Sequence, residues 1–130
     1  MDLRAIRDRI AAQHPAGIRG YPRPPGTVAV FPAYIVGDPL DIDYRLTFGG
    51  RIRVTVAIRV LVARRSEQDN TATLDDLVSA LPALLEAITP DGLWQPNGFN
   101  ITGLSGGYFQ FTNGNESEAI GADLTATIDI

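Results

Sequence analysis

The residues that could do chemistry in this chain are few, and no group is complete. His14 is the only histidine and cysteine is absent, so a catalytic triad, a histidine metal cluster or thiolate chemistry lacks its parts. Asp38, Asp41 and Asp43 could gather a calcium ion, but the central glycine and closing glutamate of an EF-hand loop are missing from their frame. We interpret this stretch as a solvated loop.

The glycine-rich segment 103–107 resembles a phosphate-binding loop in its glycine content alone. It lacks the Lys and Ser/Thr residues that contact phosphate and magnesium in such loops. Glycines inside a strand mark a bulge or a sharp bend, which is what we predict here. The sequence therefore gives little support for an enzyme, and it predicts neither a cofactor nor a metal.

Charge is divided between the two halves of the chain. Residues 1–65 contain all eleven basic residues, each an arginine, against five Asp, whereas residues 66–130 contain ten acids and no base. Two arrangements are open: the charges interleave on the folded surface, or they leave complementary faces that favour head-to-tail association into a ring or filament. The net charge of −4 and the lack of interleaved exposed aromatics argue against direct DNA binding.

Apolar residues recur at helical spacing over residues 2–13 and 74–88, which predicts two helices. Asp75 and Asp76 are placed in the first turn of the second helix, where the helix dipole favours acids. Pro82 lies inside this helix and should kink it or divide it into two pieces.

The strand pattern is clearest over residues 51–65, where apolar and polar residues alternate. Residues 27–36 predict a strand that bends or lies at a sheet edge, and residues 37–50 a loop. Residues 99–112 predict a strand broken by glycines, followed by a hairpin signal at Asn113-Gly114 and a last alternating strand.

The two alternating strands have oppositely charged outer faces. The first carries Arg51, Arg53 and Arg59, and the last carries Asp123 and Asp129. Paired within one sheet, these faces would match charges across the strands, and on neighbouring subunits they would match across an interface. The sequence leaves both possibilities open.

The element order predicts a single α+β domain spanning residues 1–130. A mixed or antiparallel sheet of about four to five strands would pack against the N-terminal helix and the central helix kinked at Pro82. No apolar run approaches the roughly 20 residues of a membrane helix, and the first residues are unlike a signal peptide, so we expect synthesis in the cytoplasm and no membrane role.

The order of elements resembles that of the tail terminator proteins of long-tailed bacteriophages (siphoviruses), especially those of actinobacterial hosts. The resemblance covers nearly the whole chain, and the stretches that carry it are residues 2–12, 21–26 leading into 28–32, 43–50 before the strand 54–62, 73–77 and 121–130. None of these stretches is a catalytic motif, and related neck proteins share much of the pattern.

The resemblance implies a structural virion protein that forms a ring, a homohexamer in this family, at the head-proximal end of the tail tube. Such a ring stops tube polymerisation and joins the tail to the head connector or stopper. The implied partners are further copies of the chain, the major tail tube protein and the connector, with genomic DNA passing non-specifically through the lumen. Assembly would occur in the host cytoplasm.

We assign two sets of residues to this role. The candidates for subunit contacts or for the lumen are Arg51, Arg53, Arg59, Asp123 and Asp129. The candidates for tube or connector contacts are Asp41, Asp43, Tyr44, Arg45, Asn113 and Gly114. The alternatives are another head-tail connector or stopper protein, and a small soluble ligand-binding or accessory enzyme domain that uses a cleft near Trp94 and residues 103–107.

Overall fold

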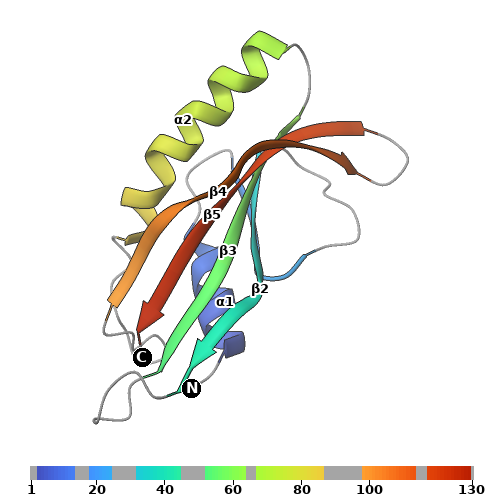
Figure 1. Ribbon diagram of the computed structural model, residues 1–130. Helices are drawn as coiled ribbons and strands as arrows, with labels where there is room; N and C mark the ends of the chain where they lie inside the picture. The colour runs from blue at the N-terminus through green and yellow to red at the C-terminus, as the bar shows by residue number, and fades with distance from the viewer. Residues whose placement is uncertain are drawn as a thin grey trace.

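The computed structural model describes residues 3–13, 18–24, 32–44, 52–63, 67–86, 98–113 and 117–129 (Figure 1). Two helices and five strands make up this part of the chain. In chain order they are α1 (Leu3–Ala12), β1 (Arg19–Tyr21), β2 (Ala33–Asp43), β3 (Arg53–Ala63), α2 (Glu67–Glu86), β4 (Gly98–Asn113) and β5 (Ser117–Asp129).

The strands form one mixed sheet in the order β1-β2-β3-β5-β4. β1 is parallel to β2, and the other neighbours are antiparallel. The sheet confirms the predicted α+β domain with four to five strands.

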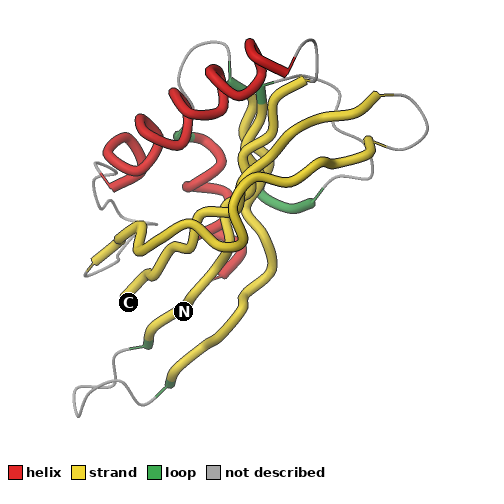
Figure 2. The backbone as a smooth tube through the Cα atoms, turned by 45° about the horizontal axis from the view of Figure 1, so that its top comes forward, coloured by secondary structure: helices red, strands yellow, loops and turns green. Residues whose placement is uncertain are grey.

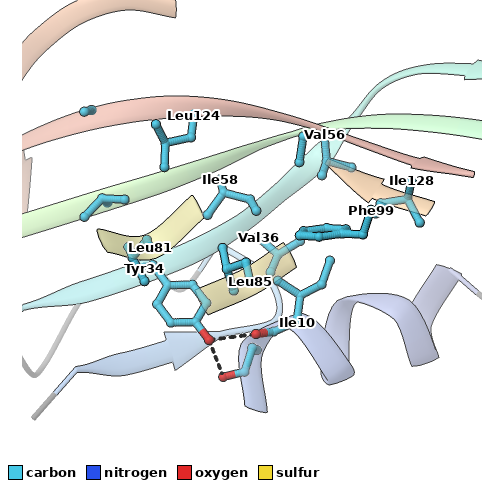
Figure 3. Packing of buried hydrophobic residues seen from close by; sticks show 14 of the residues in the cluster. Ile10, Tyr34, Val36, Val56, Ile58, Leu81, Leu85, Phe99, Leu124 and Ile128 are labelled. Atoms are coloured by element: carbon cyan, nitrogen blue, oxygen red, sulfur yellow. Dashed lines mark hydrogen bonds between the residues drawn. The ribbon is translucent and has the colours of Figure 1, made fainter. Parts of the chain in front are cut away.

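Both helices pack on the same face of the sheet. The alternate residues of β3 and β5 that were predicted to be apolar point into this core, where Val56, Ile58 and Ile128 are almost fully buried. Figure 3 shows Ile10 of α1 and Leu85 of α2 packed against these strand residues. The strict alternation of the sequence therefore marks the face of the sheet that the helices cover.

The sheet order keeps the two halves of the chain on different sides of the molecule. α1 packs on β1 and β2, whereas α2 packs on β3, β5 and β4. The first half of the chain therefore supplies one edge of the sheet with its covering helix, and the second half supplies the other edge with its own helix. The two halves meet where β3 pairs with β5.

The predicted loop over residues 37–50 is wrong in its first part, because β2 continues through Asp43. The strand absorbs Pro39 by two shifts of register against β3, one on each side of the proline. Bulges of this kind let a residue that cannot donate a ladder hydrogen bond remain in a strand. Residues 45–50, and residues 27–31 of the strand predicted before them, lie outside the described segments.

The second helix begins earlier than predicted and is not divided. α2 starts at Glu67, so Asp75 and Asp76 lie in its middle and not in its first turn. The helix runs without interruption across Pro82 to Glu86. Packing of Leu74, Leu81 and Leu85 against the sheet holds the helix together on both sides of the proline.

The glycine-rich segment lies in β4 and produces the irregularity that was predicted. The register against β5 shifts between Ile101 and Gly103 and again between Ser105 and Tyr108. Gly106 and Gly107 have φ angles of 72° and 70°, a region that residues with a Cβ rarely adopt. The C-terminal end of β4 and the N-terminal end of β5 curve away from the rest of the sheet (Figures 1 and 2).

β1 was not predicted, and it lies unusually close to the end of α1. A Cβ added to Gly20 would lie 2.0 Å from the carbonyl oxygen of Ala11. From β2, the hydroxyl of Tyr34 lies 2.7 Å from the carbonyl oxygen of Ile10 and 3.1 Å from that of Ala11 (Figure 3). Burial raises the pKa of Tyr34 well above its ordinary value. These contacts fix α1 to the β1 edge of the sheet.

Candidate assembly surfaces

The arginines of β3 pair with the aspartates of β5 inside one subunit. Arg53 and Arg59 stand directly opposite Asp129 and Asp123 in the register. The Nε atom of Arg53 donates to Oδ1 of Asp129 at 2.8 Å, and that of Arg59 donates to Oδ1 of Asp123 at 2.9 Å. Each guanidinium also donates to the second carboxylate oxygen at 3.2 Å. Of the two possibilities left open by the sequence, the structure contains the pairing within one sheet.

The outer face of the sheet also carries an apolar cluster near Arg59. The Arg59 guanidinium lies 4.7 Å from the ring centroid of Phe109 on β4, in the geometry of a cation–π contact. Ile35 and Leu61 are buried beside Phe109, on the face opposite the helices. The hydrogen bond to Asp123 raises the pKa of Arg59 above its ordinary value. The arginine is therefore held in place by a carboxylate and an aromatic ring.

We predict that the Arg59–Asp123 pair contributes about 1 kcal/mol to the free energy of unfolding, because it is bidentate but partly exposed. Arg59→Glu should lower stability by about that amount, since it also places like charges opposite each other. Asp123→Arg should do the same, and the double exchange should recover most of the loss. Urea unfolding of the four proteins measures this coupling. If the two losses of unfolding free energy simply add in the double variant, the pair contributes no coupling energy.

The end of β2 exposes two large apolar side chains among acids. Leu40 is 64% exposed and Tyr44 is 63% exposed. Asp41 and Asp43 in the same stretch are exposed as well. The structure therefore brings three of the candidates for tube or connector contacts, Asp41, Asp43 and Tyr44, together at one end of the sheet. The contact candidate Arg45 and the lumen candidate Arg51 lie outside the described residues.

The other predicted contact region is the hairpin of β4 and β5. Asn113 is the last residue of β4 and pairs with Ser117 of β5, so the predicted hairpin is confirmed, while Gly114 lies outside the described residues. The register places the Asn113–Ser117 pair at the end of the sheet opposite the end of β2, because Arg53 pairs with Asp129 at one end and Ala63 with Ala119 at the other. The two candidate contact regions therefore lie at opposite ends of the strands.

Two side-chain contacts fasten α2 to β4. The Tyr108 hydroxyl donates to Oδ1 of Asp75 at 2.5 Å, and Oε1 of Glu86 accepts from the backbone nitrogen of Ile101 at 2.7 Å. Desolvation, followed by the hydrogen bond to Asp75, raises the pKa of Tyr108 to about 12. The sequence pattern gave no signal for either contact, because each joins residues distant in the chain.

The raised pKa of Tyr108 predicts a pH-dependent contribution to stability. Because the folded pKa of about 12 exceeds the ordinary 10.0, the contribution is complete below pH 10 and is lost as the pH rises toward 12. We expect Tyr108→Phe to lower the unfolding free energy by about 0.5–1 kcal/mol at pH 9, and by progressively less above pH 10. Urea unfolding of both proteins at a series of pH values tests this, and a pH-independent difference would contradict it.

The charges of the two sides of the molecule differ in sign. On the α1 side, residues 3–13 and 18–24 contain five Arg against one Asp, and one of these arginines, Arg7, pairs with Asp38 of the neighbouring β2 at 3.1 Å. On the other side, α2 contains five acids and no base. β4 contains no charged residue. Asp123 and Asp129 of β5 form ion pairs with the arginines of β3. Charge is therefore balanced where β3 meets β5 and segregated toward the two edges of the sheet.

The described segments contain no group of three or more His, Cys, Asp or Glu residues that could hold a metal ion. None of their helices is long and apolar enough to cross a membrane. His14 and Trp94 lie outside these segments, whereas residues 103–107, the other part of the predicted cleft, are exposed residues of β4. A shallow pocket of about 220 Å³ lies between α1 and β1, lined in part by Ala12, Arg19 and Pro22.

Comparison with known proteins adds no relative: no family model matches the chain, and no curated protein matches it significantly.

Proposed function

We propose that this protein is a structural virion protein that forms a homo-oligomeric ring at the head-proximal end of a siphovirus tail tube. In this role it ends tube polymerisation and joins the tail to the head connector. The proposal is supported by the resemblance of residues 2–12, 43–50, 73–77 and 121–130 to tail terminators. The α+β domain is compatible with that role.

The observation that carries the proposal is the segregation of charge to opposite edges of the sheet. A subunit with a basic side and an acidic side favours contacts between different faces of neighbouring copies. Such heterologous contacts close into a ring when the rotation between subunits permits it. The ring size of six comes from the resemblance.

The outer face of the sheet suits the wall of a lumen through which DNA passes. Non-specific DNA affinity rises with the number of phosphates that a protein neutralises with Lys and Arg. Arg53 and Arg59 are already paired with Asp129 and Asp123, and the register places Asp41 and Asp43 of β2 on the same face, so this face has no surplus of arginine to hold phosphates. A wall of this kind would let DNA move without holding it tightly.

The two ends of the strands suit contacts with the tube and the connector. With neighbouring subunits at the sheet edges, the end of β2 and the Asn113–Ser117 end of the hairpin would face opposite ways along the ring axis. Leu40 and Tyr44 supply exposed apolar surface at one end. Exposed apolar side chains rimmed by polar residues are typical of protein contact sites.

Electron microscopy of particles made after deletion of the gene tests this function. We expect filled heads without tails beside free tails of uncontrolled length. Tailless heads beside tails of normal length would instead indicate a connector or stopper protein. Intact virions of normal tail length would refute a structural role, and saturable binding of a small molecule by the monomer would then favour the ligand-binding alternative.

A further inference from the structure

The acidic surface of α2 has no basic residue of its own half of the chain to balance it. Residues 66–130 contain no base, and Asp75, Asp76 and Glu86 are exposed on the helix. Asp75 and Glu86 accept hydrogen bonds from a neutral hydroxyl and a backbone amide, and no arginine of the described residues pairs with either carboxylate. The surface therefore favours a basic partner.

A basic surface that could serve as this partner lies at the β1 edge of the sheet, opposite the β4 edge. Arg4, Arg19 and Arg23 are exposed on α1 and on β1 with the residues that follow it. Asp8 is the one acid in residues 3–13 and 18–24, and it lies 3.7 Å from Arg23, while Arg7 of α1 pairs with Asp38 of β2 at 3.1 Å. Arg19 also lines the shallow pocket between α1 and β1, where Ala11 and Ala12 provide apolar surface.

Both helices lie on the same face of the sheet, yet no ion pair in the described residues joins Asp75, Asp76 or Glu86 of α2 to Arg4, Arg19 or Arg23. We propose that they meet between copies: α2 of one subunit docks against α1 and β1 of the next, side by side around the ring. This interface rests on the proposed function, since only an assembly of identical copies presents both surfaces in equal number. It differs from the interface that the sequence predicts between the arginine face of β3 and the aspartate face of β5, because those charges are paired within one chain.

The subunit is large enough to form two such interfaces. A standard interface buries about 800 Å² on each partner. That is roughly a tenth of the 7361 Å² accessible surface of the subunit, and each subunit would use two such areas. Because exposed charges contribute, association should weaken as salt shortens the range of their attraction.

Cysteine cross-linking tests the interface. Because the chain contains no native cysteine, only the introduced cysteines can react. Ser79→Cys lies on the exposed side of α2, and Ala12→Cys lies at the pocket edge, with Asp41→Cys at the end of β2 as the control position. One variant of each mixture carries a mass tag. At high protein concentration and low salt, a short bismaleimide should link Ser79→Cys to Ala12→Cys. It should link either variant to itself, or to Asp41→Cys, much less.

Charge reversal in the same assay tests the cause of the association. Asp76→Arg on the first chain, or Arg19→Asp on the second, should each lower the yield of linked dimer by about fivefold, the value of one exposed ion pair. Combining the two reversals should restore the yield, while Asp41→Arg should leave it unchanged. Yields no higher than those of the control pair, or dominant links between identical positions, would overturn the proposed interface.

The two proposals fail separately. A confirmed cross-link together with intact virions after gene deletion would leave the interface standing and remove the terminator function. Tailless heads after deletion, without the expected cross-link, would keep the function and place the subunit contact elsewhere.

Discussion

Replacing Gly20 by alanine is expected to lower the free energy of unfolding by about 3 kcal/mol, the upper part of the range for overpacked sites. The new Cβ would lie 2.0 Å from the carbonyl oxygen and 2.9 Å from the carbonyl carbon of Ala11. Both atoms belong to the backbone of α1, so no side-chain rotation can relieve the overlap. β1 must separate from α1, which would also displace Arg19 and disrupt the proposed subunit contact.

Gly103→Ala is the matched control, because no atom lies within 4 Å of the Cβ it would add and its φ is not positive. We expect this change to alter stability by less than about 0.5 kcal/mol. Urea unfolding measures both variants, and analytical ultracentrifugation measures self-association. A Gly20→Ala protein with unchanged stability would contradict the close packing of β1 on α1.

Removing the hydroxyl of Tyr34 is expected to lower the unfolding free energy by about 1–3 kcal/mol. The last carbonyls of a helix lack the usual partner one turn further on, and this hydroxyl lies within hydrogen-bonding distance of those of Ile10 and Ala11. The Ile10 carbonyl also accepts from the backbone nitrogen of Gln13 at 3.2 Å. Tyr34 is fully buried, so water cannot replace the lost donor without rearrangement. Tyr34→Phe tests the contribution with almost no change of shape.

Tyr44→Phe provides the control, because Tyr44 is exposed and water can replace any hydrogen bond its hydroxyl loses. Its stability should stay within about 0.5 kcal/mol of the parent protein. Equal stability of the Tyr34→Phe and Tyr44→Phe proteins in urea unfolding would show that the buried hydroxyl does not stabilise the end of α1.

The regular parts of the fold could be predicted because burial on one face imposes a period on the sequence. The alternation in residues 52–62 and 120–128 corresponds to β3 and β5, with the helix-facing side assigned correctly. The helical spacing of residues 2–13 likewise corresponds to α1. In each case the local pattern and the tertiary environment agree.

The extension of β2 could not be predicted, because its local composition and its environment disagree. Gly37, Pro39 and three aspartates are typical of a loop, but pairing with β3 holds the segment as a strand with two bulges. β1 was missed for a similar reason: three residues carry no period, and they become a strand only beside β2.

The candidate surfaces were predictable in residue type but not in arrangement. The opposite charges of Arg59 and Asp123 were evident, yet only the strand order shows that they face each other within one sheet. The division of charge along the chain was evident as well. Its meaning depends on the sheet order, which keeps the two halves at opposite edges.

The central claim is that the protein forms a head-to-tail ring at the end of a phage tail. The most direct test is a cryo-electron microscopy reconstruction of the head-proximal tail end in particles from the genome that encodes it. We predict a ring of this chain between tube and connector, with α2 of each copy beside α1 of the next. Particles whose neck is fully accounted for by other proteins would contradict the claim.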